Sequence, residues 1–232
     1  MKTCGILGGM SSHSTQIYYR ELCALTSSRL GGLHSPDLLI RSLDFDHIAR
    51  LQSEGKWDEL GGILNNAAVG LERGGADLLL LATNTMHKVA DRMMAGVTIP
   101  LLHIGDATAL AILRDKRQLR RPGLMATAFT MEQSFYVDRL EKHGLEAVVP
   151  EKTDRDVTHR IIYEELCKGV IRKESEAEYV AIAQRLINDQ GADCLILGCT
   201  EVGMLLNSGN VKVPVFDTTL IHCEEALRMM LG

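Results

Sequence analysis

The fold is decided by two stretches, Gly75-Ala76-Asp77-Leu78-Leu79-Leu80-Leu81-Ala82-Thr83-Asn84 and Gly191-Ala192-Asp193-Cys194-Leu195-Ile196-Leu197-Gly198-Cys199-Thr200. They align without a gap, and the offset from Thr83 to Cys199 is 116 residues, half of the 232-residue chain. Two more pairs of segments keep nearly that offset, namely 97–100 with 211–214 and 5–8 with 123–126. Three matches in the same order at one spacing predict two pseudo-equivalent halves.

Short apolar runs recur along the chain, and each is followed by a stretch with helical periodicity, such as 57–74 and 177–190. Such continuous Leu, Ile and Val runs are typical of parallel strands that are buried on both faces. The runs are 3–7, 37–42, 77–81, 99–103, 123–126, 147–149, 194–197 and 213–216. The sequence therefore predicts an α/β fold of two pseudo-symmetric, doubly wound lobes with parallel sheets. We expect the first lobe over residues 1–100, with 212–232 as a candidate completion, and the second over 118–211.

Composition argues against several classes of protein. The chain has 25 Lys and Arg against 30 Asp and Glu, a net charge of −5, without the strong basic cluster that marks nucleic-acid-binding surfaces. No apolar run approaches the ~20 residues that span a bilayer, and the N-terminus lacks a signal-peptide pattern. The six cysteines form no CxxC pair, and the histidines show no metal-ligand spacing. We expect a cytoplasmic protein that acts on a small molecule, with no metal, nucleic-acid or membrane partner.

Thr83 and Cys199 each follow a predicted buried strand directly, where α/β folds bind their ligands. A small hydroxyl or thiol at this place can project toward a ligand, and neighbouring backbone N–H groups can bind a carboxylate. Two pseudo-symmetric lobes would present these side chains to opposite sides of one ligand, in the cleft between the lobes. This arrangement suits a reaction in which a proton leaves one face of a carbon and arrives on the other.

The motifs around these positions resemble one known family along essentially the whole chain. They are Gly8-Gly9-Met10-Ser11 with Ser14-Thr15 and Tyr18-Tyr19, Thr83-Asn84-Thr85-Met86-His87, Thr130-Met131 with Phe135-Tyr136, and Gly198-Cys199-Thr200-Glu201. This set resembles the cofactor-independent aspartate/glutamate racemase superfamily. The resemblance implies an isomerase, an amino-acid racemase that needs neither pyridoxal phosphate nor another cofactor. It also implies an active site between two lobes and a homodimer.

The family's two catalytic cysteines correspond here to one threonine and one cysteine, Thr83 and Cys199. The L-aspartate/glutamate-specific racemases share this threonine variant. A thiol beside a helix N-terminus can be a thiolate near neutral pH, whereas a hydroxyl is a far weaker acid. Our hypothesis is that Cys199 removes the Cα proton of an L-substrate. Thr83, directly or through water, then delivers a proton to the opposite face, so that L-aspartate or L-glutamate becomes the D-enantiomer.

Further site residues follow from the turns after the strands and from the resemblance. The expected substrate-binding residues are Met10, Gln52, Asn84, Thr85, Thr127, Thr130 and Thr200. Backbone N–H groups at these turns, where helices are expected to begin, would stabilise the carbanion. For Asn84, Thr85 and Thr200, helix capping is an equally good interpretation. His87 and Glu201 are expected to stand behind the reacting groups and orient them.

Three alternatives stay open at this point. An arylmalonate-type decarboxylase works with a single cysteine, as Cys199 would. A hydantoin racemase is expected to need both thiols. A racemase-like sensor would bind an amino acid without catalysis. The intact motif Gly198–Glu201 argues against the sensor, and the amino-acid racemase motif around Asn84 argues against the decarboxylase.

Overall fold

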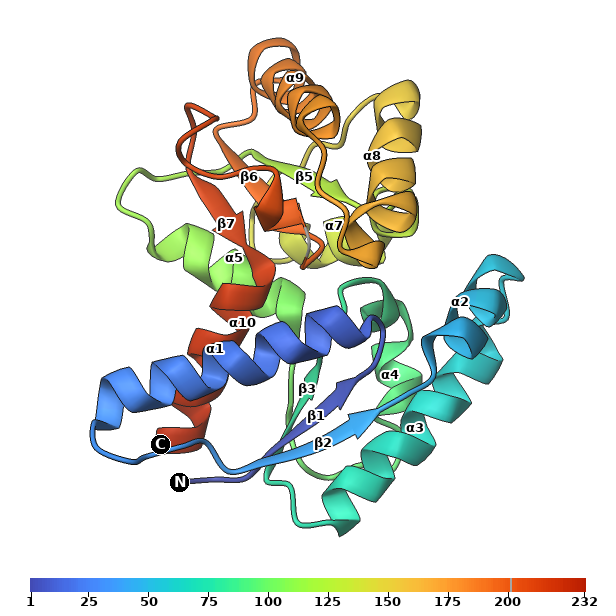
Figure 1. Ribbon diagram of the computed structural model, residues 1–232, viewed down its shortest axis with the longest axis vertical. Coiled ribbons are helices and arrows are strands. Elements are labelled where there is room, and N and C mark those ends of the chain that lie inside the picture. Colours follow the sequence, from blue (N-terminus) through green and yellow to red (C-terminus); the bar gives the residue numbers. More distant parts are fainter. Residues whose placement is uncertain (201) are drawn as a thin grey trace. The chain divides into compact units, whose positions relative to one another are not determined.

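The computed structural model describes residues 1–200 and 202–232, which form two compact units. The first unit combines Met1–Ile104 with His222–Gly232, and the second is Gly105–Ile221. The last helix, α10 (Thr218–Leu231), therefore begins in the second unit and contributes most of its length to the first (Figure 1).

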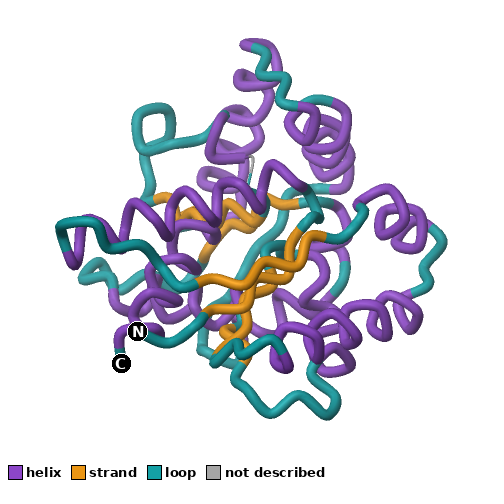
Figure 2. The backbone as a smooth tube through the Cα atoms, turned by 60° about the horizontal axis from the view of Figure 1, so that its bottom comes forward, coloured by secondary structure: helices purple, strands orange, loops and turns teal. Residues whose placement is uncertain are grey.

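The first unit is built on a parallel sheet with the strand order β2-β1-β3-β4. Figure 2 shows the strands in orange and the helices in purple. Besides α10, its elements are β1 (Cys4–Gly8), α1 (Ser12–Leu30), β2 (Leu38–Ser42), α2 (Phe45–Ser53), α3 (Trp57–Arg73), β3 (Leu78–Leu81), the 3-10 helix η1 (Thr85–Val89), α4 (Ala90–Met93) and β4 (Leu101–Leu102). Because the strands are parallel, the residues that follow them gather at one edge of the sheet.

Both faces of this sheet are buried. Leu79 and Leu81 belong to a core cluster with α2 and α3, whereas Leu78 and Leu80 belong to a cluster with α1 and α10. Figure 1 shows α1 and α3 on opposite sides of the sheet. Side chains alternate between the two faces along a strand, which explains why β3 consists of leucine alone.

The second unit contains a parallel sheet with the strand order β5-β6-β7. Its elements are α5 (Ile104–Arg114), β5 (Pro122–Ala126), α6 (Ala128–Glu132), α7 (Ser134–Glu141), α8 (Lys152–Glu164), the 3-10 helix η2 (Leu166–Lys168), α9 (Lys173–Gln190), β6 (Cys194–Gly198), the 3-10 helix η3 (Val202–Met204) and β7 (Val215–Asp217). A core cluster joins β6 to α8 and α9. The predicted α/β fold with two parallel sheets is thus confirmed.

The internal repeat of the sequence is also a repeat of contacts. Gly5 pairs with Leu79 between β1 and β3, and Gly123 pairs with Leu195 between β5 and β6. A Cβ atom on Gly5 would lie 2.9 Å from Leu79 Cδ2, and one on Gly123 would lie 3.0 Å from Leu195 Cδ2. In each half, a glycine thus lets a leucine of the neighbouring strand pack against the backbone.

One predicted strand was wrong. The run 147–149 is no strand, because Val148 forms only an isolated bridge with Gly123 and Pro150 has no N–H to extend a ladder. The helices that are expected after β3 and β6 are the 3-10 helices η1 and η3. A 3-10 turn is tighter than an α-helical one and suits the sharp turn at each strand end.

Neither a membrane span nor a metal-binding group of side chains occurs among the residues that the structure describes. Within 1–200 and 202–232, no helix is both long and apolar enough to cross a bilayer. In the same part of the chain, no three His, Cys, Asp or Glu side chains are grouped so that they could hold a metal ion.

Candidate active site

Thr83 lies just beyond β3, at the carboxyl edge of the first sheet, and is half-buried. Its N–H donates to the Leu81 carbonyl at 2.8 Å, so the chain turns sharply there. Its own carbonyl lies 2.8 Å from Nδ1 of His87. The Ser14 hydroxyl donates to the carbonyl of Ala82 at 3.1 Å. The peptide groups on both sides of Thr83 are therefore fixed, and rotation about Cα–Cβ selects the direction of its hydroxyl.

The turn after β1 is held by short hydroxyl side chains. Thr15 Oγ1 accepts from the Gly9 N–H at 2.7 Å and donates to the Ser11 carbonyl at 3.0 Å. Ser11 Oγ accepts from the Ser14 N–H at 3.2 Å and so caps α1. Gly9 has φ +88°, and a Cβ there would lie 2.2 Å from the Leu43 carbonyl oxygen. Only glycine fits this close approach of the β1 and β2 ends.

The other predicted substrate-binding residues of the first unit lie along the same edge of the sheet. Met10 follows β1, Gln52 is in α2 after β2, and Asn84 and Thr85 follow Thr83. All four are buried, and Met10 belongs to the core cluster that includes α2 and α3. The fold of this unit therefore brings Met10, Asn84 and Thr85 to the strand ends, whereas Gln52 lies in the last turn of α2.

His87 was expected to stand behind the reacting groups, and it contacts the backbone of Thr83. Besides the Thr83 carbonyl, it contacts the Ile104 N–H, which lies 3.2 Å from Nε2. Both ring nitrogens thus bind backbone groups, which makes His87 a support of the Thr83 loop. Glu201, the other residue predicted to orient the reacting groups, lies outside the described residues.

Cys199 has the place in the second unit that Thr83 has in the first. It directly follows β6 and is half-buried. Its carbonyl accepts from the Val202 N–H at 3.1 Å, at the start of η3. The Thr218 hydroxyl donates to the carbonyl of Leu197 in β6 at 2.9 Å. Contacts within the second unit thus hold the backbone near Cys199.

The remaining predicted binding residues lie at the ends of β5 and β6. Thr127 is the N-cap residue of α6, and its hydroxyl lies 3.2 Å from that of Thr130, with both residues buried. His159 from α8 lies beside them, and its Nδ1 accepts from the Ala128 N–H at 3.2 Å. Burial lowers the pKa of His159, which favours this neutral acceptor form. Thr200 follows Cys199 and is half-buried.

Two other cysteines lie in the strands themselves. Burial raises the pKa of Cys4 in β1 to about 12, and it also raises the pKa of Cys194 in β6 far above the ordinary range of a thiol. Both side chains are therefore protonated at neutral pH and cannot serve as bases. Cys199 is the half-buried thiol at a strand end.

These features agree with the comparison to known protein families. A model of the Asp/Glu/hydantoin racemase family matches residues 7–226. The chain belongs to this family. The resemblance seen in its motifs is thereby confirmed.

Three members or relatives of this racemase family illustrate the similarity. A crystal structure of an Asp/Glu racemase candidate from Yersinia pestis is 45% identical, with a TM-score of 0.92 and 100% of both chains covered. An aspartate racemase homologue from Pyrococcus horikoshii OT3 is 35% identical, with a TM-score of 0.87 and the same coverage of 100%. The broad specificity amino-acid racemase RacX of Bacillus subtilis (strain 168) is 23% identical over 221 residues, 93% of this chain and 92% of RacX. The chain is accordingly an isomerase of the amino-acid racemase type.

Tyr18 and His222 contact each other in the first unit, and neither is among the predicted site residues. Tyr18 Oη lies 2.8 Å from Nδ1 of His222, and both residues are fully buried. One signal was available in the sequence. His222 shares a helix face with the apolar residues Cys223, Ala226 and Met230, and a histidine on such a face needs hydrogen-bond partners.

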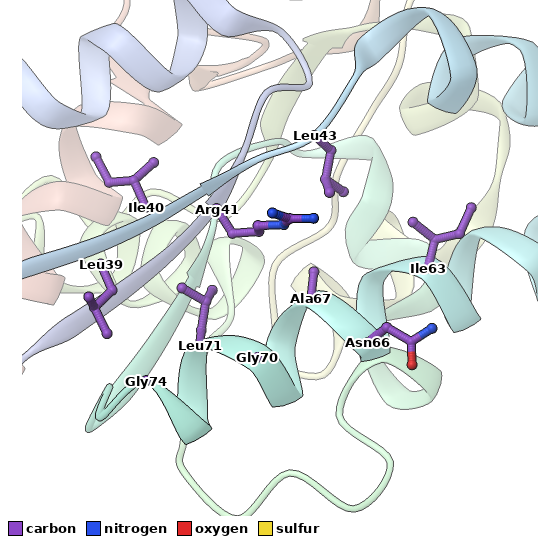
Figure 3. Close-up of a pocket in the computed structure, with 10 residues that line it drawn as sticks. All are labelled: Leu39, Ile40, Arg41, Leu43, Ile63, Asn66, Ala67, Gly70, Leu71 and Gly74. Atoms are coloured by element: carbon purple, nitrogen blue, oxygen red, sulfur yellow. The ribbon is translucent and has the colours of Figure 1, made fainter.

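A groove of about 580 Å³ lies between β2 and α3 of the first unit. Figure 3 shows the Arg41 guanidinium extending from β2 over this groove. The other lining residues are Leu39, Ile40, Leu43, Ile63, Asn66, Ala67, Gly70, Leu71 and Gly74. None of the predicted site residues is among these ten.

Proposed function

We propose that this racemase interconverts the L- and D-enantiomers of aspartate and glutamate without pyridoxal phosphate, with Cys199 and Thr83 as the two groups that exchange a proton with Cα. The observation that best supports this proposal is the equivalence of the two strand ends. Thr83 follows β3 and Cys199 follows β6, and both strands pair with a glycine-bearing neighbour in the same register. The names of the Pyrococcus homologue and of RacX support an amino-acid substrate.

The two reacting groups are unequal acids. A thiol ordinarily titrates near pH 8.5, whereas an alcohol hydroxyl keeps its proton throughout the physiological range. Cys199 is therefore the base that takes the Cα proton from the L-enantiomer. Thr83 delivers a proton to the opposite face, directly or through water, and solvent then restores its hydroxyl proton.

The remaining residues bind the substrate and spread the negative charge of the deprotonated intermediate. Hydroxyl and amide groups at strand ends are suitable donors to a carboxylate, because they are oriented before the substrate binds. The proposed contributors are Asn84, Thr85, Thr127, Thr130 and Thr200, with Met10 and Gln52 facing the rest of the substrate.

The inequality of Thr83 and Cys199 has a defined kinetic signature. Two enantiomers have equal free energies, so kcat/KM for racemisation must be the same in both directions. The difference between the L- and D-enantiomers is therefore expected in the exchange of the Cα proton for solvent deuterium without inversion at Cα. Cys199 can remove the Cα proton of an L-substrate and return deuterium to the same face, whereas Thr83 is a poor base toward a D-substrate.

The test follows L-glutamate and L-aspartate in heavy water, with loss of the Cα proton measured by NMR and inversion by chiral chromatography. Cys199→Ala is expected to lose both processes by ~10²–10⁴-fold, the usual contribution of a general base. Thr83→Ala is expected to lose inversion by a similar factor and to keep proton loss from the L-substrate. Cys23→Ala, which removes a half-buried thiol on α1, is the matched control and should retain both.

Three results would contradict this proposal. Equal exchange without inversion from both enantiomers would refute the asymmetry of Thr83 and Cys199. Tight binding of an L-amino acid with no exchange at Cα would indicate a sensor. Release of carbon dioxide from an arylmalonate, without amino-acid exchange, would indicate a decarboxylase.

We further propose that the enzyme is a cytoplasmic homodimer. The family resemblance supports the dimer, and cysteines that remain thiols suit the reducing conditions of the cytoplasm. Sedimentation equilibrium at micromolar concentration tests the first point, because a mass of 25.5 kDa would identify a monomer. Fractionation of cells tests the second.

A further inference from the structure

His87 contacts two backbone groups at the same time. Its Nδ1 lies 2.8 Å from the Thr83 carbonyl, and its Nε2 accepts from the Ile104 N–H at 3.2 Å. A carbonyl only accepts and an amide N–H only donates, so Nδ1 carries a hydrogen and Nε2 does not. His87 is therefore a neutral imidazole in one defined tautomer. It ties the Thr83 loop to the end of the segment 102–104, which begins at the last residue of β4.

His222 holds the other end of that segment in the opposite tautomer. Its Nε2 donates to the Leu102 carbonyl at 2.9 Å, and its Nδ1 lies 2.8 Å from the Tyr18 hydroxyl. Burial, followed by the positive charge that His87 would carry if protonated, lowers the pKa of His222 to about 3. At neutral pH, Nδ1 therefore has no hydrogen and accepts from Tyr18 Oη.

The two imidazoles form one buried array. Their ring centroids are 6.1 Å apart, and the His103 ring lies 4.4 Å from that of His87. Tyr18 and His222 are fully buried, and His87 and His103 are nearly so. A hydrogen bond between buried groups is costly to lose, which favours the arrangement seen here.

Building on the proposed function, we propose that Tyr18 and His222 act through His87 as positioning residues for Thr83. We call Tyr18, His222 and His87 the histidine clamp. Its contacts run from Tyr18 through His222 to the Leu102 carbonyl, along the backbone to Ile104, and through His87 to the Thr83 carbonyl. Helix α10 thereby fixes the backbone from which the Thr83 hydroxyl projects.

The histidine clamp acts on one of the two proton transfers. The backbone beside Cys199 is held by contacts of the second unit, from Val202 and Thr218, in which the clamp takes no part. A loosened clamp is therefore expected to impair delivery from Thr83 and to leave removal of the L-proton by Cys199 intact. The diagnostic quantity is the ratio of inversion to Cα proton loss for an L-substrate. This ratio does not depend on how much of the enzyme is folded.

Tyr18→Phe and His222→Gln remove the hydroxyl and the ring while they keep most of the buried volume. We expect each to lower the ratio of inversion to proton loss by about tenfold, since a misplacement of about 1 Å can cost ~10²-fold. His87→Asn keeps an amide donor near the position of Nδ1, so its ratio is expected to exceed that of His87→Ala. The matched control is Tyr179→Phe. Tyr179 is also fully buried, and its hydroxyl donates to the Thr158 carbonyl at 3.1 Å in the second unit.

The ring nitrogens provide a readout that does not depend on activity. In protein labelled with ¹⁵N-histidine, at neutral pH, we expect His87 to be protonated at Nδ1 and His222 at Nε2. The His87→Asn and His222→Gln spectra assign the signals. The Tyr18→Phe variant should shift the Nδ1 signal of His222, because that nitrogen loses its donor.

Separate results refute the clamp and the proposed function. An unchanged ratio in active Tyr18→Phe and His222→Gln variants, or the opposite tautomers, would refute the histidine clamp alone. A lowered ratio in Tyr179→Phe would show that the loss of a buried tyrosine hydroxyl outside the clamp has the same effect, and it would also refute the clamp. A wild-type enzyme with neither proton loss nor inversion would refute the proposed function and, with it, the role of the clamp.

Discussion

The two units share a scaffold and differ in how they support their strand ends. In the first unit the Leu79 N–H donates to the Pro100 carbonyl, and in the second the Leu195 N–H donates to the Pro214 carbonyl, both at 2.8 Å. The strand ends carry Thr83 and Cys199, which are 116 residues apart. At the same offset, His87 of the first unit corresponds to Gly203 of the second.

This difference follows from the space at each site. A Cβ on Gly203 would lie 2.9 Å from Oδ2 of Asp217, so no larger side chain fits without rearrangement. Oδ1 of Asp217 accepts from the N–H groups of Thr219 and Leu220 at the start of α10. Neutral imidazoles thus support the strand end that bears an alcohol, whereas a carboxylate occupies the equivalent space near the strand end that bears a thiol. The repeat thus preserves the strand-end position of Thr83 and Cys199 and changes the residues around it.

Exchange of the reacting groups should reverse the asymmetry of the two units, and it is the largest effect that we expect. In the double variant Thr83→Cys with Cys199→Thr, the good base faces the side from which a D-substrate is deprotonated. Exchange without inversion should pass from the L- to the D-enantiomer, with a change of the L-to-D ratio of ~10²-fold or more. Proton loss in heavy water measures this ratio. An L-preference that survives the exchange would show that substrate binding, and not base strength, sets the asymmetry.

The two sheets can be compared by how much an added methyl group at Gly5 or Gly123 lowers the free energy of unfolding. A Cβ on Gly5 would meet Leu79 Cδ2 at 2.9 Å and Ala76 Cβ at 3.0 Å, whereas the nearest atoms to one on Gly123 are at 3.0 and 3.2 Å. We expect Gly5→Ala and Gly123→Ala each to cost about 1–3 kcal/mol, with Gly5→Ala the more costly, because overpacking forces neighbours to shift. Urea unfolding measures both costs.

Gly62→Ala is the matched control for these substitutions. Gly62 lies in α3, and a Cβ added there would meet nothing within 4 Å outside the backbone of its own helix. Alanine at this position should therefore stabilise the helix by up to ~1 kcal/mol. If Gly5→Ala and Gly123→Ala lower the free energy of unfolding no more than Gly62→Ala does, there is more space beside these two strand glycines than the repeated contacts imply.

Much of the fold could be predicted from the sequence because strong local patterns determine it. Runs such as 78–81 and 194–197 are apolar throughout, and a parallel strand buried on both faces is the structure that this pattern favours. The run 147–149 failed because three apolar residues before a proline do not distinguish a strand from one bridge. The sequence did not distinguish 3-10 helices from α-helices after β3 and β6, since capping residues are similar for both helix types.

The site was predictable only where residues lie close together in the chain. The strand-end positions of Thr83 and Cys199 follow from the repeat, and the contact of His87 with the Thr83 carbonyl spans four residues. The bond between Tyr18 and His222 spans 204 residues, and no periodicity or motif encodes such a pair. It depends on α10 packing against the first sheet, which is a property of the tertiary structure.

Acid is expected to destabilise the first unit more than the second, and this is the smallest effect that we expect. Burial lowers the pKa of His222 from about 6.5 to about 3, so below pH 6.5 the unfolded chain binds a proton that the folded first unit does not. The stability that His222 confers is therefore fully present above pH 6.5 and is lost as the pH falls toward 3. Between pH 7.5 and 5.5 the loss is about 1.4 kcal/mol, and it depends on the unfolded pKa alone, because the folded pKa lies far below 5.5.

The single tryptophan, Trp57, lies in α3 of the first unit, so its fluorescence in urea reports the unfolding of that unit. His222→Gln should remove the loss between pH 7.5 and 5.5 from this signal. His159→Gln is the matched control, because His159 is half-buried in the second unit, where the carboxylates of Glu132 and Asp156 oppose the effect of burial on its pKa. The His159→Gln substitution should leave the unfolding transition of Trp57 unchanged at both pH values. An equal response to both substitutions would mean that the units unfold as one, and the supports of the two strand ends would then contribute to a common stability.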